Sequence, residues 1–430
     1  MQNPSQKPAT QIEPSLLIGP ITQLLPMAGL PLKGPLEDKD LAPLLHQGIV
    51  IGGSDLLEIA DYNSLYLQHK QAIENKQVQH IHLSHPMVAL PGFIDAHTHI
   101  CYAGDRAADY ALRNSGASYL DIAKEGGGIW SSIGSTRAAS QEELVQNTLK
   151  NAQRHLSQGV TTIEVKSGYA GSVSEELKML RAIQKANEES PADLISCCLA
   201  AHIFPKDYPG SPVNYLNEIV QDLFPILVQE NLTHRVDAFI EQTAFTPSVI
   251  GPYLEAAKAH GFDLCIHADQ FSTAGSQVAI QYGALSADHL EASTQKEIQA
   301  LAASNTLAMA LPGASLGLGM GYAPARALLD AGAGLVIASD WNPGSAPMGH
   351  LLCQAALLGA AEKLSHAEVL AGISYRAAAA LALTDRGVLS AGKMADILLF
   401  PTAHYRNILY QQGMMGPSMI FKSGQLVYKK

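Results

Sequence analysis

Two histidines separated by one residue, His97 and His99, end the apolar segment VALPGFIDAHTH at residues 88–99. Residues two apart on a strand point to the same side, so both imidazoles can reach one metal ion. Three later apolar segments also end in a polar residue, namely His267, His289 and Asp340. Three histidines and one aspartate suit zinc or iron and leave a position open for water. The pattern therefore indicates a catalytic metal site rather than a structural one.

A metal ion in such a site would lower the pKa of bound water to about 7, which makes hydroxide available at neutral pH to attack an electron-poor carbon. Asp340, if it binds through one oxygen, keeps the other free to move a proton from the water to a leaving nitrogen. His289 is expected to orient the water or the polarised substrate atom rather than to bind the metal. A single histidine is more often a hydrogen-bonded core residue. The combination of four histidines and one aspartate at strand ends is what favours catalysis.

Eight short apolar segments carry these residues, and most alternate with longer segments of helical periodicity. The helical patterns are at 141–156, 174–186, 247–260, 294–303 and 366–383. An α/β fold follows, either a (β/α)8 TIM-type barrel or a doubly wound sheet. Polar residues of catalytic type end almost every strand, which favours the barrel because its strand ends meet on one face. The expected strands are 88–99, 161–168, 195–202, 236–241, 264–269, 285–290, 306–313 and 335–340.

The two ends of the chain have a different pattern. Before residue 88 and after residue 389, short alternating segments are punctuated by Gly, Pro and Asp, which is typical of strands and turns. We expect residues 1–87 and 389–430 to form one composite β-sandwich domain beside a barrel of residues 88–388. The alternative is that each end forms an appendage of its own.

Composition limits the function classes. The chain has 430 residues, of which 47% are hydrophobic and 16% charged, so a sizeable core is expected and disorder is excluded. A net charge of −11 argues against nucleic acid as a partner. Five cysteines without CxxC spacing are expected to be free thiols in the cytoplasm. No secretory signal is recognisable, and the apolar stretch 306–322 is too interrupted to span a membrane.

The string PGFIDAHTH and the later strand-ending histidines and aspartate resemble the amidohydrolase superfamily, whose members hydrolyse C–N bonds in cyclic amides and amidines. Longer strings, including GVTTIEVKSGY, AAHIFPKDYPG, HADQ and SDWNPGS, are similar to its imidazolonepropionase family. The resemblance implies hydrolysis of 4-imidazolone-5-propanoate to N-formimidoyl-L-glutamate in histidine degradation. It also implies a homodimer, which is typical of the family. It implies one Zn or Fe ion bound by His97, His99, His267 and Asp340.

The same resemblance assigns a substrate pocket. Arg106, Tyr169 and His202 would hold the propionate and ring of a small anionic substrate. An arginine suits this task because its guanidinium offers a two-pronged fork to a carboxylate. The rest of the pocket would be formed by Gln270, Asn342, Gly344 and Ser345.

Three positions depart from the family pattern. Gln270 replaces a glutamate found in some members, so it cannot act as a base. Glu241 ends the fourth strand where two-metal relatives have a lysine, which favours one metal but leaves Glu241 as a possible ligand of a second. The segment 315–322 also departs from the family pattern and could reshape the pocket, so one alternative is a deaminase or amidohydrolase for another small heterocycle. A separate alternative is an inactive barrel with a structural role, which would be expected to lose metal ligands, whereas all are present here. A glycine-rich stretch at 125–129 predicts a loop near the barrel mouth.

Overall fold

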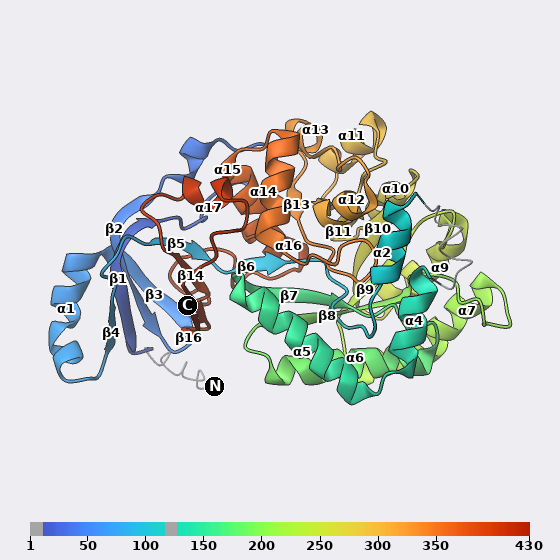
Figure 1. The fold of residues 1–430 in the computed structure, drawn as a ribbon, viewed down its shortest axis with the longest axis horizontal. Coiled ribbons are helices and arrows are strands. Elements are labelled where there is room, and N and C mark those ends of the chain that lie inside the picture. The colour runs from blue at the N-terminus through green and yellow to red at the C-terminus, as the bar shows by residue number, and fades with distance from the viewer. Residues whose placement is uncertain (1–11, 117–126) are drawn as a thin grey trace, which may run out of the picture.

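The computed structural model describes residues 12–116 and 127–430, so the first two residues of the loop expected at 125–129 lie outside the described part. Two sheets organise the chain (Figure 1). Strands from both chain ends, drawn blue and red, form the sheet on the left. The other sheet is enclosed by helices on the right, with α5 (Gln141–Ser157) and α6 (Val173–Glu189) along its lower side.

The enclosed sheet is the predicted barrel. Its eight strands follow one another in sequence order, and every neighbouring pair is parallel. A doubly wound sheet would reverse its order part-way, so that alternative is excluded. The two edge strands approach each other at their ends, where Asp340 N donates to His97 O at 3.1 Å and His99 N to Trp341 O at 2.8 Å. The strands are β6 (Phe93–Asp95), β7 (Val160–Lys166), β8 (Asp193–Ala201), β9 (Arg235–Phe239), β10 (Asp263–Ala268), β11 (Ser286–His289), β12 (Leu307–Ala310) and β13 (Leu335–Ile337).

Apolar faces pack the surrounding helices onto the barrel. Leu144, Val145, Ala152 and Leu156 of α5 are buried, with the spacing of one helical face. Ser140 begins this helix with a capping box to Glu143. The other helices around the barrel are α2 (Ala107–Asn114), α4 (Ile129–Ala138), α7 (Pro212–Glu218), η2 (Ile219–Leu223), α8 (Phe224–Gln229), α9 (Pro247–Ala259), α10 (Gly275–Tyr282), α11 (Gln295–Ala303), α12 (Pro312–Leu318), α13 (Ala325–Asp330), α14 (Leu351–Glu362), α15 (His366–Gly372) and α16 (Tyr375–Ala380).

The helix expected at 366–383 is two helices, so its continuity was predicted wrongly. Helix α15 ends at Gly372, and α16 begins at Tyr375. A Cβ on Gly372 would lie 2.9 Å from the side chain of Ile337, so glycine allows this close approach to β13. Ser374 lies between the helices with φ −130° and ψ −107°, outside the helical region, and interrupts the backbone.

The second sheet has the order β16-β15-β14-β5-β1-β2-β3, with β4 paired to β1. Both chain ends contribute strands to it, as expected, and these strands form one hydrogen-bonded sheet. The strand predicted at 88–99 is divided, because 88–91 pair with β14 and β1 whereas the barrel begins at Phe93. The bounds are β1 (Leu16–Leu24), η1 (Asp38–Leu41), β2 (Leu44–Gly52), β3 (Asp55–Asp61), α1 (Tyr62–Glu74), β4 (Gln79–His82), β5 (Val88–Pro91), β14 (Ile397–Phe400), α17 (Arg406–Tyr410), β15 (Met419–Lys422) and β16 (Gln425–Lys429).

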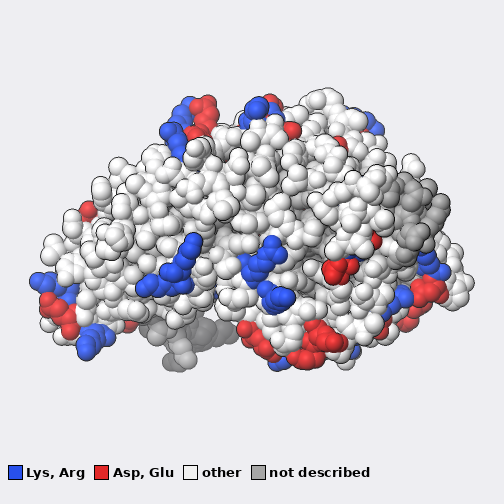
Figure 2. Space-filling model, viewed as in Figure 1, with Lys and Arg blue, Asp and Glu red and all other residues white. Residues whose placement is uncertain are grey.

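Surface charge is scattered. Figure 2 shows lysine, arginine and acidic side chains in small groups separated by wide uncharged areas on the face in view. The five cysteines are free, as predicted, and four of them are buried. No helix in the described ranges has the length and apolarity needed to cross a membrane.

Helix α12 fixes the loop that follows β13. A Cβ on Gly317 would fall 1.7 Å from the backbone oxygen of Ser345, so α12 and this loop are in direct contact. The loop contains Asp340, which makes the contact relevant to the expected metal site.

We expect Gly317→Ala to displace residues 342–346 and to cost about 1–3 kcal/mol of stability, as overpacking usually does. Activity should fall together with the free energy of unfolding. Gly321→Ala is the matched control, because nothing lies within 4 Å of a Cβ there and its φ is not positive. Chemical denaturation of both variants checks this, and equal stability of the two would contradict the contact.

Candidate metal centre

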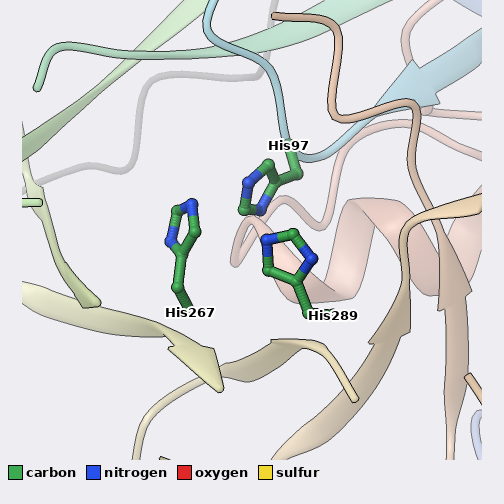
Figure 3. A group of neighbouring side chains, drawn as sticks. All are labelled: His97, His267 and His289. Carbon is green, nitrogen blue, oxygen red and sulfur yellow. The ribbon is translucent and has the colours of Figure 1, made fainter. Parts of the chain in front are cut away.

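Four predicted ligand atoms converge at the carboxyl-terminal end of the barrel. His99 Nε2 lies 3.4 Å from Asp340 Oδ1 and 3.4 Å from His267 Nε2. His97 Nε2 is 3.6 Å from the same Asp340 oxygen. Figure 3 shows His97, His267 and His289 extending toward one another from different parts of the barrel. The four residues that the sequence predicts as ligands are therefore neighbours, although the first is at position 97 and the last at position 340.

The barrel strands place these side chains. His97 and His99 follow β6, while His267 lies within β10. Asp340 follows β13 and has a φ of 50°, which turns the chain immediately after the strand. Because the hydrogen bonds from Asp340 N and His99 N join the two edge strands, ligands from the first and last strands meet. The closed seam of the barrel is thus also the place where the ligands gather.

Two aspartates fix which imidazole nitrogens face the centre. Asp288 Oδ2 lies 2.7 Å from His97 Nδ1, and Asp237 Oδ2 lies 3.0 Å from His267 Nδ1. A carboxylate behind Nδ1 accepts its proton and leaves Nε2 available for a metal, the usual arrangement of metal-binding histidines. Buried His97 Nε2 has no hydrogen-bond partner. This unmatched acceptor, near the Nε2 atoms of His99 and His267, which face each other at 3.4 Å, fits a cation.

The imidazoles are held neutral, as metal ligands must be. Burial lowers the pKa of His99 to about 3 and that of His267 to about 3, and it lowers the pKa of His97 well below its usual value. Burial raises the pKa of Asp340, partly offset by the nearby histidines. A cation among these groups would favour the ionised carboxylate.

His289 lies beside the ligands, with a different set of contacts. One of its ring nitrogens is within 4.8 Å of nitrogens of His97 and His267. On its other side, Nδ1 is 3.6 Å from Glu291 Oε2, and Glu291 accepts a hydrogen bond from Ser315 Oγ at 2.8 Å. Burial lowers the pKa of His289, but the carboxylates of Glu291, Asp340 and Asp288 together outweigh burial, and the pKa is raised. A proton-bearing imidazole here can donate a hydrogen bond into the centre.

Two predicted substrate residues, His202 and Tyr169, border the same centre, and Arg106 lies beside Gly344 in the loop after Asp340. The His202 ring stacks on His99 with centroids 5.5 Å apart, and its Nδ1 lies 3.0 Å from Gly168 O. Tyr169 is buried, with its ring centroid 5.9 Å from that of His99. Arg106 Nε donates to Asp109, which orients the guanidinium.

The loop after β13 contains three other predicted substrate residues, Asn342, Gly344 and Ser345. Asn342 donates to Asp340 O at 2.7 Å and to Ser345 Oγ at 2.8 Å, and its Oδ1 accepts from the backbone of Gly344 and Ser345. Its amide is therefore used within the loop. A Cβ on Gly344 would lie 3.1 Å from Arg106 Nη1, so glycine leaves room for the guanidinium. Nearly buried Gln270 follows β10.

Glu241 holds a loop in this structure. Its Oε1 accepts from Phe271 N at 2.9 Å and Ser272 N at 2.8 Å, and its Oε2 accepts from Ser272 Oγ at 2.6 Å. The carboxylate thus fixes the segment next to Gln270. Within residues 12–116 and 127–430, Glu241 belongs to no group of ligand-type side chains close enough to share an ion.

A third group of ligand-type residues lies deeper in the barrel, formed by Glu164, Cys197 and Cys265. The Lys166 ammonium is 2.8 Å from Glu164 Oε1 and 3.7 Å from Cys265 Sγ. A positive charge in contact with these atoms would repel a metal cation, so this group differs from the centre above.

Sequence reasoning missed two aspartates of the centre, Asp237 and Asp288. Asp237 interrupts the apolar strand VDAF, and Asp288 directly precedes His289. The available signal was a charged residue inside a strand that is otherwise apolar, because such a residue needs a buried partner.

The model of the amidohydrolase family matches residues 88–427. The chain belongs to the amidohydrolase family. Imidazolonepropionase of Myxococcus xanthus is 40% identical over 342 residues, covering 79% of this chain and 81% of the relative. Imidazolonepropionase of Bdellovibrio bacteriovorus is 37% identical over 419 residues and covers 96% of both chains. The family resemblance predicted from the sequence is confirmed.

Solved structures agree on the fold. A triazine hydrolase variant superposes with a TM-score of 0.75 at 19% identity and covers 96% of this chain and 94% of the other. Atrazine chlorohydrolase from Arthrobacter aurescens, solved with zinc, gives a TM-score of 0.71 at 18% identity over 96% and 95%. At these identities the likeness supports the barrel and its companion sheet, and the predicted fold class is confirmed.

Proposed function

We propose that this enzyme hydrolyses 4-imidazolone-5-propanoate to N-formimidoyl-L-glutamate, a step of histidine degradation. The observation that carries the proposal is the convergence of His97, His99, His267 and Asp340 at one end of the barrel. The relatives named imidazolonepropionase, matched over most of their length, support the choice of substrate. The five free thiols suit the cytoplasm as its location.

We assign one Zn or Fe ion to the four convergent ligands, since both metals accept imidazole and carboxylate. The ion would act as a Lewis acid that activates water and polarises the substrate. Glu241 is committed to the loop beside Gln270, which argues for a single ion.

Asp340 has the geometry to move a proton. Its Oδ1 lies 3.6 Å from His97 Nε2 and 3.4 Å from His99 Nε2, whereas Oδ2 accepts from Ser345 Oγ at 3.4 Å. With this single long hydrogen bond, the second oxygen keeps acceptor capacity and would take a proton from water and deliver it to the ring nitrogen that leaves. His289, whose pKa Glu291 raises, would donate a hydrogen bond to the oxygen on which charge develops.

Arg106 is the group that would recognise the propionate. Asp109 holds its Nε, so the two Nη groups remain for a carboxylate, beside Gly344. Tyr169 and His202 would cover the ring, with Gln270 and the loop at Gly344 and Ser345 completing the pocket. We assign Asn342 to shaping that loop, because its amide is used there.

Direct turnover tests the function. The metal-loaded protein should open 4-imidazolone-5-propanoate and release N-formimidoyl-L-glutamate, identified by mass spectrometry. Cytosine, guanine and hydantoin are the comparison substrates, because the altered segment 315–322 near His289 bears on substrate choice. Activity on one of these and none on imidazolonepropionate would transfer the assignment to another small heterocycle.

Arg106→Ala should raise KM for imidazolonepropionate by about 10- to 100-fold with a smaller change in kcat, because a charge-assisted hydrogen bond to carboxylate contributes roughly 1.5–3 kcal/mol. Steady-state kinetics measures this. Arg181→Ala is the matched control, since Arg181 is a half-exposed arginine of α6 that pairs with Glu230 after α8, and the KM of this variant should equal that of the wild type. An unchanged KM for Arg106→Ala would remove the carboxylate clamp from the proposal.

Asp340→Ala should abolish turnover whatever the substrate.

A further inference from the structure

A buried lysine lies immediately beneath the metal ligands. Lys166 ends β7, is fully buried, and its ammonium contacts Glu164 Oε1 and Asp237 Oδ2, each at 2.8 Å. Removing an ammonium from water costs several kcal/mol unless its partners compensate. Two carboxylates provide that compensation here. One of them, Asp237, is the residue that contacts His267.

Asp237 is surrounded by hydrogen-bond donors. Its Oδ2 accepts from Lys166 Nζ and lies 3.0 Å from His267 Nδ1. Its Oδ1 accepts from the backbone nitrogens of Ala238 at 2.7 Å and His267 at 3.2 Å. Because a lysine ammonium and the two amides can only donate, they hold this carboxylate as an acceptor. His267 Nδ1 must then carry the proton, which leaves the lone pair on Nε2.

We propose that Lys166 is a positioning residue for the metal centre: it anchors Asp237 Oδ2 beneath His267, and Asp237 in turn keeps His267 Nε2 turned toward His97 and His99. The chain of contacts runs from Lys166 to Asp237 to His267 and ends at the metal. The inference rests on the metal centre of the proposed function and is independent of the substrate.

A second buried cation, Arg235, allows the positioning role of Lys166 to be distinguished from simple charge balance. Arg235 lies in the same interior, 3.8 Å from Glu164 Oε1, and it donates to Ala380 O at 3.1 Å. Its contacts are with Glu164 and with Ala380 of α16 rather than with Asp237. Both cations balance buried carboxylates, but only Lys166 reaches the aspartate behind a metal ligand. Arg235→Met is therefore the matched control for Lys166→Met.

The test is a double-mutant cycle on metal affinity. Competition with a chelator gives the Kd for Zn²⁺ of the wild type, Lys166→Met, Asp237→Asn and the double variant, with no use of enzymatic activity. Loss of the direct partner of a metal ligand typically weakens binding about 10- to 100-fold, which we expect for Asp237→Asn, and for Lys166→Met, one contact further out, we expect about 10-fold. In the Asp237→Asn background the same lysine change should alter Kd by about twofold at most, as should Arg235→Met alone.

Three results would overturn the inference. These are a wild-type Kd in folded Lys166→Met, an equal loss for Arg235→Met, or an additive cycle. If Lys166→Met does not fold, nitrogen-15 NMR of histidine-labelled, metal-free wild type decides instead. His267 should carry its proton on Nδ1, and a proton on Nε2 would refute the proposal. Failure of the wild type itself to bind Zn²⁺ would refute the metal centre, which distinguishes the two cases.

Discussion

Closure of the barrel is the constraint on which the site depends. His97 and His99 follow the first barrel strand and Asp340 follows the last, so they can share an ion only where the two ends of the sheet meet. Two backbone hydrogen bonds, from Asp340 N and from His99 N, join the strands at that seam. The same interactions that close the sheet therefore bring the ligands together. His267, from the middle of the sheet, completes the set across the barrel mouth.

Beneath the ligands, the barrel interior is charged rather than apolar. Glu164, Lys166, Arg235 and Asp237 are all buried there, two acids against two bases. Burial alone would raise the pKa of Asp237, but His267 and Lys166 outweigh it and lower the pKa, so this carboxylate stays ionised. A buried charge is tolerated only when it is paired and hydrogen-bonded. In this protein the pairing also supports a metal ligand from below.

Much of the site was predictable because a parallel barrel delivers its strand ends to one face. An apolar run followed by His or Asp identifies both the strand and its functional end, which is why the four ligands were found. Asp237 and Asp288 were missed because their roles depend on neighbours from other strands. The hydrogen bonds of Glu241 and Asn342 lie in loops whose path no periodicity encodes. The break of 366–383 at Gly372 and the division of 88–99 at Gly92 both arise from close packing between distant segments.

The most direct test is crystallography of the metal-loaded protein with anomalous scattering at the metal edge. The account predicts one peak about 2.0–2.2 Å from the Nε2 atoms of His97, His99 and His267 and from an oxygen of Asp340. A peak elsewhere, such as between Cys197 and Cys265, with these four residues left without an ion, would contradict it.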